Sequence, residues 1–383
     1  MLKALFWSLL VLGLYPYVIY PVLVVFIGRL RSLKVARDDG FLPRITIITA
    51  AYNEKHHIGE TVRNKLAQDY PPELMEILVV SDESTDGTDE IVTEISKEDS
   101  RVRLLRNQPR QGKTAALNFA VPQARGDIIV FSDANSVYRP DAIRKIVRNF
   151  ADPAIGYVTG SMRYVNADGS LVGDGCSAYM RYENALRAAE TRVGSIVGVD
   201  GGVDAVRRVL YKTMKADLLP DFVLPLAVIE QRHRVIYEPD AILTEHALSN
   251  QADEYKMRVR VALRAFWALW EKRSLLNPLS YGLFSWQLWS HKVLRYISFL
   301  PLGAAAGMNW MLFDGGDIYR LAALAQVAFA VLVVLAIASP RQFGQWSVAR
   351  YCYYFALLNW AGAVAFVSFL RGEKKVIWQP RGG

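Results

Sequence analysis

The stretch Ile45-Thr-Ile-Ile-Thr-Ala-Ala-Tyr-Asn-Glu54 decides the fold, because a short β-branched apolar run gives way at once to polar residues. Such a run is typical of a strand buried in a parallel sheet. A segment with helical composition, Ile58–Gln68, follows and ends before Tyr70-Pro-Pro72. A strand followed by a helix is the repeating unit of α/β proteins, so its recurrence along the chain would define the fold class.

The unit recurs three more times before residue 151. Further strands are predicted at Glu76–Ser81, Val102–Leu105 and Asp127–Ser132. Helices are predicted between and after them, at Asp89–Ser96, Thr114–Val121 and Asp141–Phe150. Repeated units of this size predict an α/β fold with a mostly parallel, Rossmann-like sheet covered by helices.

Composition excludes some protein classes and leaves others open. A hydrophobic content of 52% with 21% charged residues is too apolar for a disordered chain. The net charge of +8 fits nucleic acid, an anionic membrane surface or a phosphate-bearing substrate equally well. The two cysteines, Cys176 and Cys352, form neither a C-x-x-C pair nor a zinc-binding spacing, which favours a reduced, cytosolic compartment.

An apolar run near the N-terminus predicts a membrane anchor. Leu5–Ile27 carries no charge and is long enough to cross a bilayer core of roughly 30 Å. A signal peptide is the alternative, but the run is too long and no small-residue cleavage site follows it. Basic residues cluster after the run, at Arg29, Arg31, Lys34 and Arg37. The positive-inside rule therefore places the following domain in the cytosol.

Three apolar runs near the C-terminus are also long enough to span a membrane. They are Val293–Phe313, Leu321–Ala338 and Tyr351–Leu370. Three crossings would put the basic end of the chain outside, against the charge rule, so whether the last run crosses stays open. We expect an integral protein of the inner or plasma membrane. Its expected parts are an anchor at 1–28, a cytosolic domain at 43–250, a helical, interfacial region at 251–291, transmembrane helices at 292–371 and a basic tail at 372–383.

Polar residues follow three of the predicted strands. The strands end in Ala51-Tyr-Asn-Glu54, Ser81-Asp-Glu-Ser-Thr-Asp-Gly-Thr88 and Ser132-Asp-Ala-Asn135. Turn chemistry alone explains any one of these loops. Ligands of open parallel sheets bind beyond the carboxyl ends of the strands, so three such loops together favour a binding site.

These residue types suit a nucleotide sugar. Asp82 can accept hydrogen bonds from a base edge, and Asp133 with Asn135 can meet a ribose and a divalent cation, Mg²⁺ or Mn²⁺. Arg110 and Lys113 can neutralise a diphosphate. No nucleic acid is expected as a partner.

Gly112-Lys-Thr114 resembles the end of a P-loop, but position 107 is asparagine where that motif needs glycine, so the ATPase interpretation fails. Asp221, among apolar neighbours, is the expected general base because such surroundings raise the pKa of a carboxyl. A helix N-cap is its structural alternative.

The order of these motifs resembles family 2 glycosyltransferases, the GT-A-fold enzymes that include cellulose, chitin and hyaluronan synthases. The resemblance covers about Arg44 to Trp270, and the flanking apolar runs fit the membrane-bound branch. It rests on Tyr52-Asn-Glu54, Ser81–Thr88, Gly112-Lys-Thr-Ala-Ala-Leu-Asn118, Ser132–Asn135 and Pro220-Asp-Phe222. It implies an inverting mechanism in which Asp221 is the base. It also implies that Asp133 and Asn135 occupy the family's D-x-D position and that an acceptor segment contains Gly201 and Gly202. Of the donor, the resemblance implies that Lys113 contacts the phosphates and that the nucleoside is contacted by Tyr52, Glu54 and Asp82.

Two departures from the family pattern matter. Asn135 replaces the second D-x-D acid and should hold a metal more weakly than a carboxylate does. The Q-x-x-R-W motif of processive synthases is reduced to Met257-Arg-Val-Arg-Val261, which favours transfer of a single sugar. Arg258 and Arg260 can still bind a diphosphate, unless they form a solvated helix face. His246 is a weak candidate for a further metal ligand.

The expected function is transfer of a sugar from a nucleotide sugar, with a UDP-sugar as first choice, to a lipid-linked or glycan acceptor at the bilayer. Such a reaction belongs to surface polysaccharide or glycolipid synthesis. One alternative is a processive polysaccharide synthase. Another is a non-catalytic scaffold or transporter with a degenerate nucleotide-binding domain, against which the retained Asp82, Asp133 and Asp221 argue. The oligomeric state is not indicated.

Overall fold

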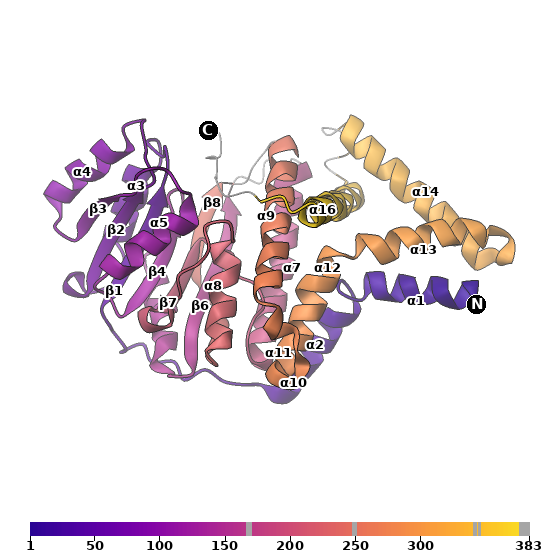
Figure 1. Ribbon diagram of the computed structural model, residues 1–383, viewed down its shortest axis with the longest axis horizontal. Coiled ribbons are helices and arrows are strands. Elements are labelled where there is room, and N and C mark those ends of the chain that lie inside the picture. The colour runs from indigo at the N-terminus through magenta and orange to yellow at the C-terminus, as the bar shows by residue number, and fades with distance from the viewer. Residues whose placement is uncertain (166–170, 247–250, 340–342, 344–345, 375–383) are drawn as a thin grey trace.

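The structure is a computed structural model that describes residues 1–165, 171–246, 251–339, 343 and 346–374 (Figure 1). Its centre is one eight-stranded sheet with the strand order β3-β2-β1-β4-β7-β6-β8-β5. The strands are β1 (Ile45–Ala51), β2 (Met75–Ser81), β3 (Val102–Arg106), β4 (Ile128–Asp133), β5 (Val137–Tyr138), β6 (Ile155–Val165), β7 (Val203–Arg207) and β8 (Arg234–His246).

The first four strands pair in parallel, and β6 pairs in parallel with β8, so the prediction of a mostly parallel sheet is confirmed. Strand β7 runs antiparallel to both of its neighbours, which joins the two parallel parts. The register aligns Ala51 with Ser81 and Ala50 with Asp133. The polar ends of β1, β2 and β4 therefore meet at one edge of the sheet.

Helices cover both faces of this sheet and bury two apolar cores. On one face, α3 (Ile58–Leu66), α4 (Thr88–Glu98) and α6 (Ala142–Val147) contribute Ile58, Val92 and Ile143 to a shared core. On the other face, α5 (Lys113–Ala120), α8 (Pro220–Glu230) and α9 (Gln251–Glu271) contribute Leu117, Val223 and Ala265. Each large aliphatic side chain buried in this way stabilises the fold by roughly 1.5–3 kcal/mol.

The expected anchor, Leu5–Ile27, is not one continuous helix. It forms α1 (Leu2–Leu14) and α2 (Ile19–Arg31), which bend by 57° at the break between them. Pro16 stands in that break, and Pro21 lacks the N–H that would bond to the carbonyl of Tyr17. The bent pair is apolar enough to count as one broken span or as a re-entrant segment.

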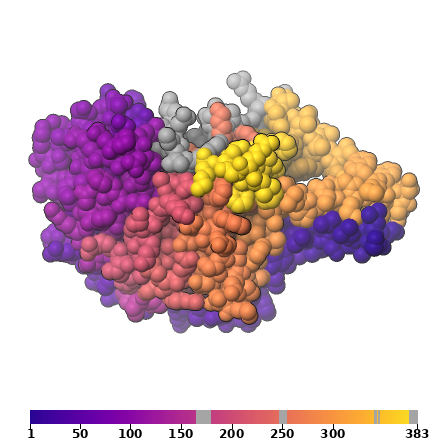
Figure 2. Space-filling view, viewed as in Figure 1, coloured from indigo at the N-terminus to yellow at the C-terminus, as the bar shows by residue number. Residues whose placement is uncertain are grey.

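The expected span Val293–Phe313 is also interrupted. A π-helical turn (Trp289–Val293) and the short α12 (Leu294–Tyr296) precede α13 (Phe299–Met311), which is shorter than a span. In the described part of the chain, the two unbent helices long and apolar enough to cross a membrane are α14 (Asp317–Ala338) and α16 (Ser347–Leu370). Helices α1 and α13 pack together and extend with α14 as an arm from the sheet domain (Figures 1 and 2).

Between the arm and the sheet domain lie α7 (Leu171–Val193) and α9, followed by α10 (Pro278–Tyr281) and α11 (Leu283–Leu288). Phe284 and Leu288 of α11 are buried in the core that contains α5 and α8. The sequence of this segment, Phe284-Ser-Trp-Gln-Leu-Trp289, mixes aromatic and polar residues and allows both an interfacial helix and an ordinary packed helix. Its buried side chains agree with the packed helix.

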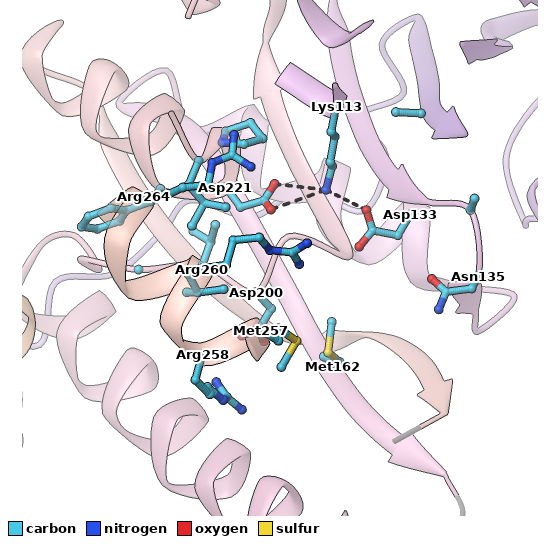
Figure 3. A pocket seen from close by; sticks show the side chains of 18 of the residues that line it. Lys113, Asp133, Asn135, Met162, Asp200, Asp221, Met257, Arg258, Arg260 and Arg264 are labelled. Carbon is cyan, nitrogen blue, oxygen red and sulfur yellow. Dashed lines mark hydrogen bonds and ion pairs between the residues drawn. The ribbon is translucent and has the colours of Figure 1, made fainter. Parts of the chain in front are cut away.

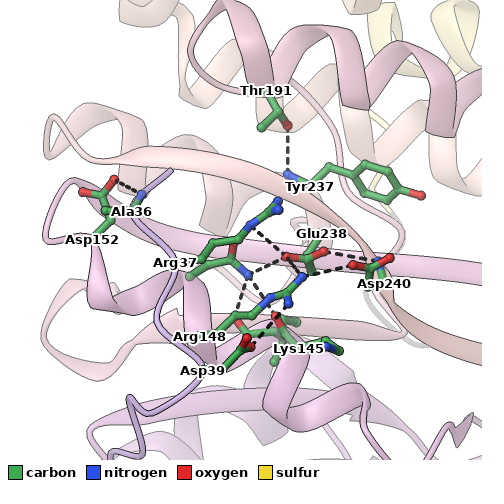
Figure 4. Close-up of polar contacts among 12 residues, drawn as sticks. Ala36, Arg37, Asp39, Lys145, Arg148, Asp152, Thr191, Tyr237, Glu238 and Asp240 are labelled. Atoms are coloured by element: carbon green, nitrogen blue, oxygen red, sulfur yellow. Dashed lines mark hydrogen bonds and ion pairs between the residues drawn. The ribbon is translucent and has the colours of Figure 1, made fainter. Parts of the chain in front are cut away.

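A buried ion cluster fixes the segment that leaves α2 (Figure 4). Glu238 of β8 is fully buried, and its carboxylate lies 3.3 Å from Arg37 and 3.3 Å from Arg148. Arg148 also pairs with Asp39 and Asp240. Removing one partner of a buried ion pair typically costs about 3–5 kcal/mol, so this cluster holds the anchor's connecting segment firmly against the sheet.

Candidate active site

A cavity of about 310 Å³ opens at the carboxyl edge of the sheet, between the strand ends and helices α7, α8 and α9 (Figure 3). Most residues predicted for the site line it. From the sheet side these are Tyr52, Glu54, Asp82, Lys113, Asp133 and Asn135, and from α8 and α9 they are Asp221, Arg258 and Arg260. Gly201 and Gly202 do not line it, and the side chain of His246 lies outside the described residues.

Lys113 joins the two acids at the centre of the cavity. Its ammonium lies 2.7 Å from the carboxylate of Asp133 and 3.4 Å from that of Asp221 (Figure 3). Burial lowers the pKa of Lys113, but the two carboxylates raise it further, so that the net shift is upward. A fixed positive charge therefore stands between the D-x-D position and the expected base.

Asp221 lies in the first turn of α8, where Leu219 occupies the N-cap position. The helix-cap alternative is therefore not what the structure shows. Burial raises the pKa of the Asp221 carboxyl, while the nearby Lys113 lowers it by a smaller amount. A raised pKa suits a carboxylate that must take a proton from a hydroxyl near neutral pH.

Arg264 fixes the loop that leads into α8. Its guanidinium donates hydrogen bonds to the carbonyl of Leu218 and to the hydroxyl of Thr114, the latter at 3.2 Å. Thr114 in turn donates to the same carbonyl at 2.9 Å. Burial lowers the pKa of Arg264 to about 10. The helices carrying Lys113 and Asp221 are thus held together by a third helix, α9.

Gly201 stands behind the expected base. A Cβ at Gly201 would lie 2.6 Å from the Asp221 carboxyl, and its φ of +91° favours glycine as well. A Cβ at Gly202 would meet Leu243 at 2.8 Å. The structure therefore places both glycines as close-packing positions, and the cavity wall here consists of Gly198, Val199 and Asp200.

Asp82 has a structural role besides the predicted one. Its carboxylate, 4% exposed, accepts hydrogen bonds from Asn107 at 2.7 Å and from the backbone amides of Gln111 at 3.0 Å and Gly112 at 2.7 Å. These bonds shape the loop before Lys113. One acceptor position of the carboxylate remains for a ligand.

Nearby, the guanidinium of Arg110 lies 3.4 Å from the centre of the Tyr52 ring. Tyr52 lines the cavity, and the guanidinium stacked on its ring extends this flat surface beyond the cavity wall.

One face of α3 holds the loop that carries Asp133 and Asn135, and we call Thr61, Asn64 and Lys65 the α3 clamp. Thr61 donates to the carbonyl of Ala134 and Lys65 to that of Ser136, both at 2.6 Å. Asn64 donates to the carbonyl of Tyr138 and accepts from its amide. Lys65 is fully buried, and burial lowers its pKa by more than the charges of Glu245 and Asp133 raise it.

Asp133 and Asn135 fit a divalent cation only in part. Both line the cavity with oxygen-bearing side chains two residues apart, which suits Mg²⁺ or Mn²⁺. Within the described residues, no group of three or more His, Cys, Asp and Glu side chains gathers as a metal site. A metal held here would therefore need further oxygens from the donor diphosphate.

The structure also brings in residues that the sequence analysis did not single out. Lys292 and the buried ion pair of Arg187 and Asp200 line the cavity beside Tyr179. Asp204 of β7 is 1% exposed, and neither of its carboxylate oxygens has a hydrogen-bond partner among the described residues. The sequence could have indicated Asp204, because an acid inside an apolar strand is unusual. Lys292 and Arg187 reach the cavity only through tertiary packing, which no local sequence pattern indicates.

Comparison with known proteins adds a family and a fold. The model of "Glycosyl transferase family 2" matches residues 46–195. The poly-beta-1,6-N-acetyl-D-glucosamine synthase of Staphylococcus epidermidis is 26% identical over 72% of this chain and 69% of its own length. The beta-monoglucosyldiacylglycerol synthase of a Nostoc species is 30% identical over 52% of this chain and 43% of its own.

Among solved structures, a mannosyltransferase from Pyrobaculum calidifontis in complex with GDP-Man and Mn²⁺ is similar with a TM-score of 0.69. It is 25% identical in sequence, and the similarity covers 94% of this chain and 99% of that one. The similarity therefore includes the helices outside the sheet domain as well as the sheet itself.

Proposed function

Because this chain belongs to glycosyl transferase family 2 and has the GT-A fold, we propose that it transfers one sugar from a nucleotide sugar to a membrane-associated acceptor with inversion at the sugar. The observation that carries this proposal is the convergence of Asp133, Lys113 and Asp221 in one cavity. A base, a cation for the phosphates and a D-x-D acid are the groups that such a transfer needs.

The donor is assigned to the sheet side of the cavity. The flat surface of Tyr52 and Arg110 suits a nucleobase, and the remaining acceptor position of Asp82 suits its edge. Lys113 faces the position of the diphosphate. We propose a UDP-sugar as donor, with a GDP-sugar as the alternative because the similar mannosyltransferase is a complex with GDP-Man.

In the proposed reaction Asp221 takes the proton from the acceptor hydroxyl. The acceptor oxygen forms a bond to the anomeric carbon while the bond from that carbon to the diphosphate oxygen breaks. The nucleoside diphosphate leaves with the bonding electron pair, and Lys113 stabilises the charge that develops on it. A metal held by Asp133 and Asn135 would supply further positive charge at the leaving group, as Mn²⁺ accompanies GDP-Man in the similar mannosyltransferase.

The acceptor is assigned to the side of the cavity that faces the apolar helices, near Arg258, Arg260 and Tyr296. Relatives act in polysaccharide and in glycolipid synthesis, so a glycan and a lipid acceptor both fit the family. The incomplete Q-x-x-R-W motif favours transfer of one sugar over polymerisation. The bent N-terminal pair, α14 and α16 support attachment to a membrane. We propose the inner or plasma membrane, with the sheet domain in the cytosol as the basic residues after α2 predict.

The test is turnover of a panel of UDP- and GDP-sugars by the detergent-purified chain, with Mg²⁺, with Mn²⁺ and with chelator. We expect release of nucleoside diphosphate from one donor, and loss of that release in chelator. Donor binding measured by calorimetry accompanies the panel. A chain that neither binds nor turns over any donor would contradict the proposal and support the non-catalytic scaffold.

A further inference from the structure

Lys292 is a cation of the cavity wall that no acid among the described residues contacts directly. It lies in the π-helical turn Trp289–Val293 and lines the cavity. Its ammonium lies 5.8 Å from the centre of the ring of Phe222, the residue that follows the expected base Asp221 in the sequence. A Cβ added at Gly198 would lie 2.5 Å from the same ammonium. Among the described residues, it forms no hydrogen bond and no ion pair.

The acids nearest to Lys292 are already engaged by other groups. Glu183 lies 2.5 Å from Arg295 and 3.3 Å from His291, and Glu190 lies 2.7 Å from the other ring nitrogen of His291. Asp200 pairs with Arg187. None of these three acids contacts the Lys292 ammonium directly, and a buried ammonium without a hydrogen-bonded partner is unfavourable unless a ligand brings an anion to it.

The charged neighbours of Lys292 differ from those of Lys113. Lys113 interacts with Asp133, Asp221 and Asp204, at the donor side. Lys292 interacts with Glu183, Arg295 and Arg187, on the side of α7 and the turn that leads into α12 and α13. Lys113 and Lys292 are therefore separate positive positions in the cavity, and Lys292 lies nearer to the helices that leave the sheet domain.

We propose that Lys292 binds a phosphate of the acceptor, and that the acceptor is a sugar joined to a lipid through a phosphate or diphosphate. This inference rests on the proposed transferase function. Lys292 makes no contact with Asp221, so the phosphate and the attacking hydroxyl are different groups of one acceptor. A sugar linked to a lipid through a diphosphate has this arrangement, with its hydroxyls beyond the phosphates and its lipid chain toward the membrane.

The Gly198–Asp200 segment explains why the site accepts a head group. The backbone at Gly198 passes so close to the Lys292 ammonium that a side chain there would collide with it. The carbonyl of Gly198 accepts a hydrogen bond from Arg187 at 3.0 Å, which fixes the segment. Glycine at 198 thus leaves the ammonium accessible from the cavity.

The experiment compares matched acceptors in phosphatidylcholine vesicles that contain the full-length chain. Each acceptor sugar is presented in two forms, linked to a polyprenyl chain through diphosphate and linked to an alkyl chain without phosphate. We expect the diphosphate form to be used with a kcat/KM at least about tenfold higher, since a charge-assisted contact contributes on that scale. Equal use of both forms would overturn the inference.

The variant Lys292→Gln tests whether Lys292 is the residue that binds the acceptor phosphate. It should raise the KM for the diphosphate acceptor about tenfold and leave the KM for the donor unchanged, whereas Lys34→Gln, at an exposed lysine in the segment after α2, should change neither. A rise in donor KM instead would assign Lys292 to the donor diphosphate and overturn the inference. If Lys292→Gln fails to bind donor, the wild-type comparison decides alone. Donor hydrolysis without transfer to either form would overturn this inference but leave the proposed transferase function standing.

Discussion

Around Asp221, single atoms decide whether the carboxylate can work as a base. Lys113 lies 3.4 Å from one side of it, and the backbone of Gly201 closes another side. The Cβ that glycine lacks would fall 2.6 Å from the carboxyl. The position of the Asp221 carboxylate therefore depends on glycine at position 201 as much as on the contact with Lys113.

Gly201→Ala should displace Asp221 and lower transfer by about 10²-fold or more, because small displacements of catalytic groups have effects of that size. The positive φ adds a cost in stability of roughly 1 kcal/mol. Gly194→Ala is the matched control, since a Cβ there meets nothing within 4 Å. Steady-state transfer rates and melting temperatures measure both variants. Full activity of Gly201→Ala would mean that Asp221 is not the base.

Asp204 makes stability depend on pH in an unusual direction. Burial, followed by the charge of Asp221, raises its pKa from 3.8 to about 8. Between these values the folded state keeps a proton that the unfolded chain has released, so the free energy of unfolding falls as pH rises. Below about pH 4 and above about pH 8 the contribution is constant.

The asparagine in the variant Asp204→Asn does not titrate, so the variant's free energy of unfolding should not show this fall between about pH 4 and about pH 8. The variant should melt at a higher temperature than the wild type, and the difference should grow from pH 5 to pH 8. The control Glu94→Gln, at a side chain 68% exposed, should show no such trend. Thermal unfolding across this pH range provides the measurement, and a difference that does not vary with pH would show that Asp204 is ionised throughout.

At the scale of elements, local pattern predicted the first half of the sheet well. β1 coincides with the apolar run Ile45–Ala51. β2 and β3 differ from the predicted strands by one residue at one end, and β4 is shifted by one residue at both ends. The antiparallel insertion of β7 depends on pairing between segments far apart in the chain, which no local run encodes. The predicted span Val293–Phe313 did not include the break between α12 and α13, because a hydropathy pattern reports how apolar a segment is and not whether its helix is continuous.

The same limit applies to the site. Asp133 and Asn135 were predicted from a polar strand end, and Asp221 from an acid among apolar neighbours, and all three line the cavity. The α3 clamp was not predicted, because the sequence does not distinguish Lys65, which is buried, from an exposed lysine on a helix. A fully buried lysine that donates to a loop carbonyl needs tertiary structure to be recognised.

Lys65→Met tests the α3 clamp. The change removes the donor to the carbonyl of Ser136, and the loop with Asp133 and Asn135 should become less ordered. We expect a loss of about 1–3 kcal/mol in stability and roughly tenfold weaker Mn²⁺ binding in the presence of nucleoside diphosphate, measured by electron paramagnetic resonance. Lys97→Met, at a lysine 66% exposed, is the control. Reduced stability with unchanged Mn²⁺ binding would show that Lys65 only supports the fold.

At the scale of the whole molecule, the sheet domain and the apolar arm are joined through the cluster at Glu238 and through α9. Helix α14 exposes large apolar side chains along its length, with Leu324 65% and Val331 49% exposed. Such a surface is stable in lipid and not in water. The arm is therefore the part of the molecule that the bilayer covers in our account.

Val331→Lys should weaken membrane attachment, because a lysine near the centre of a membrane helix costs about 2.5–3.5 kcal/mol. The matched change at the sheet domain is Val209→Lys, where the side chain is 81% exposed. Carbonate extraction of membranes separates inserted from peripheral protein. Equal retention of the two variants in the membrane fraction would mean that α14 does not lie in lipid.

The most direct test of the central claim is sugar transfer by Asp221→Asn, measured together with donor binding by calorimetry. Removing a general base lowers the rate by about 10²–10⁴-fold. The account predicts a loss of this size with donor binding retained, because the proposed nucleoside contacts are Tyr52 and Asp82 and not Asp221. Transfer by Asp221→Asn at the wild-type rate would contradict the account and place the base elsewhere.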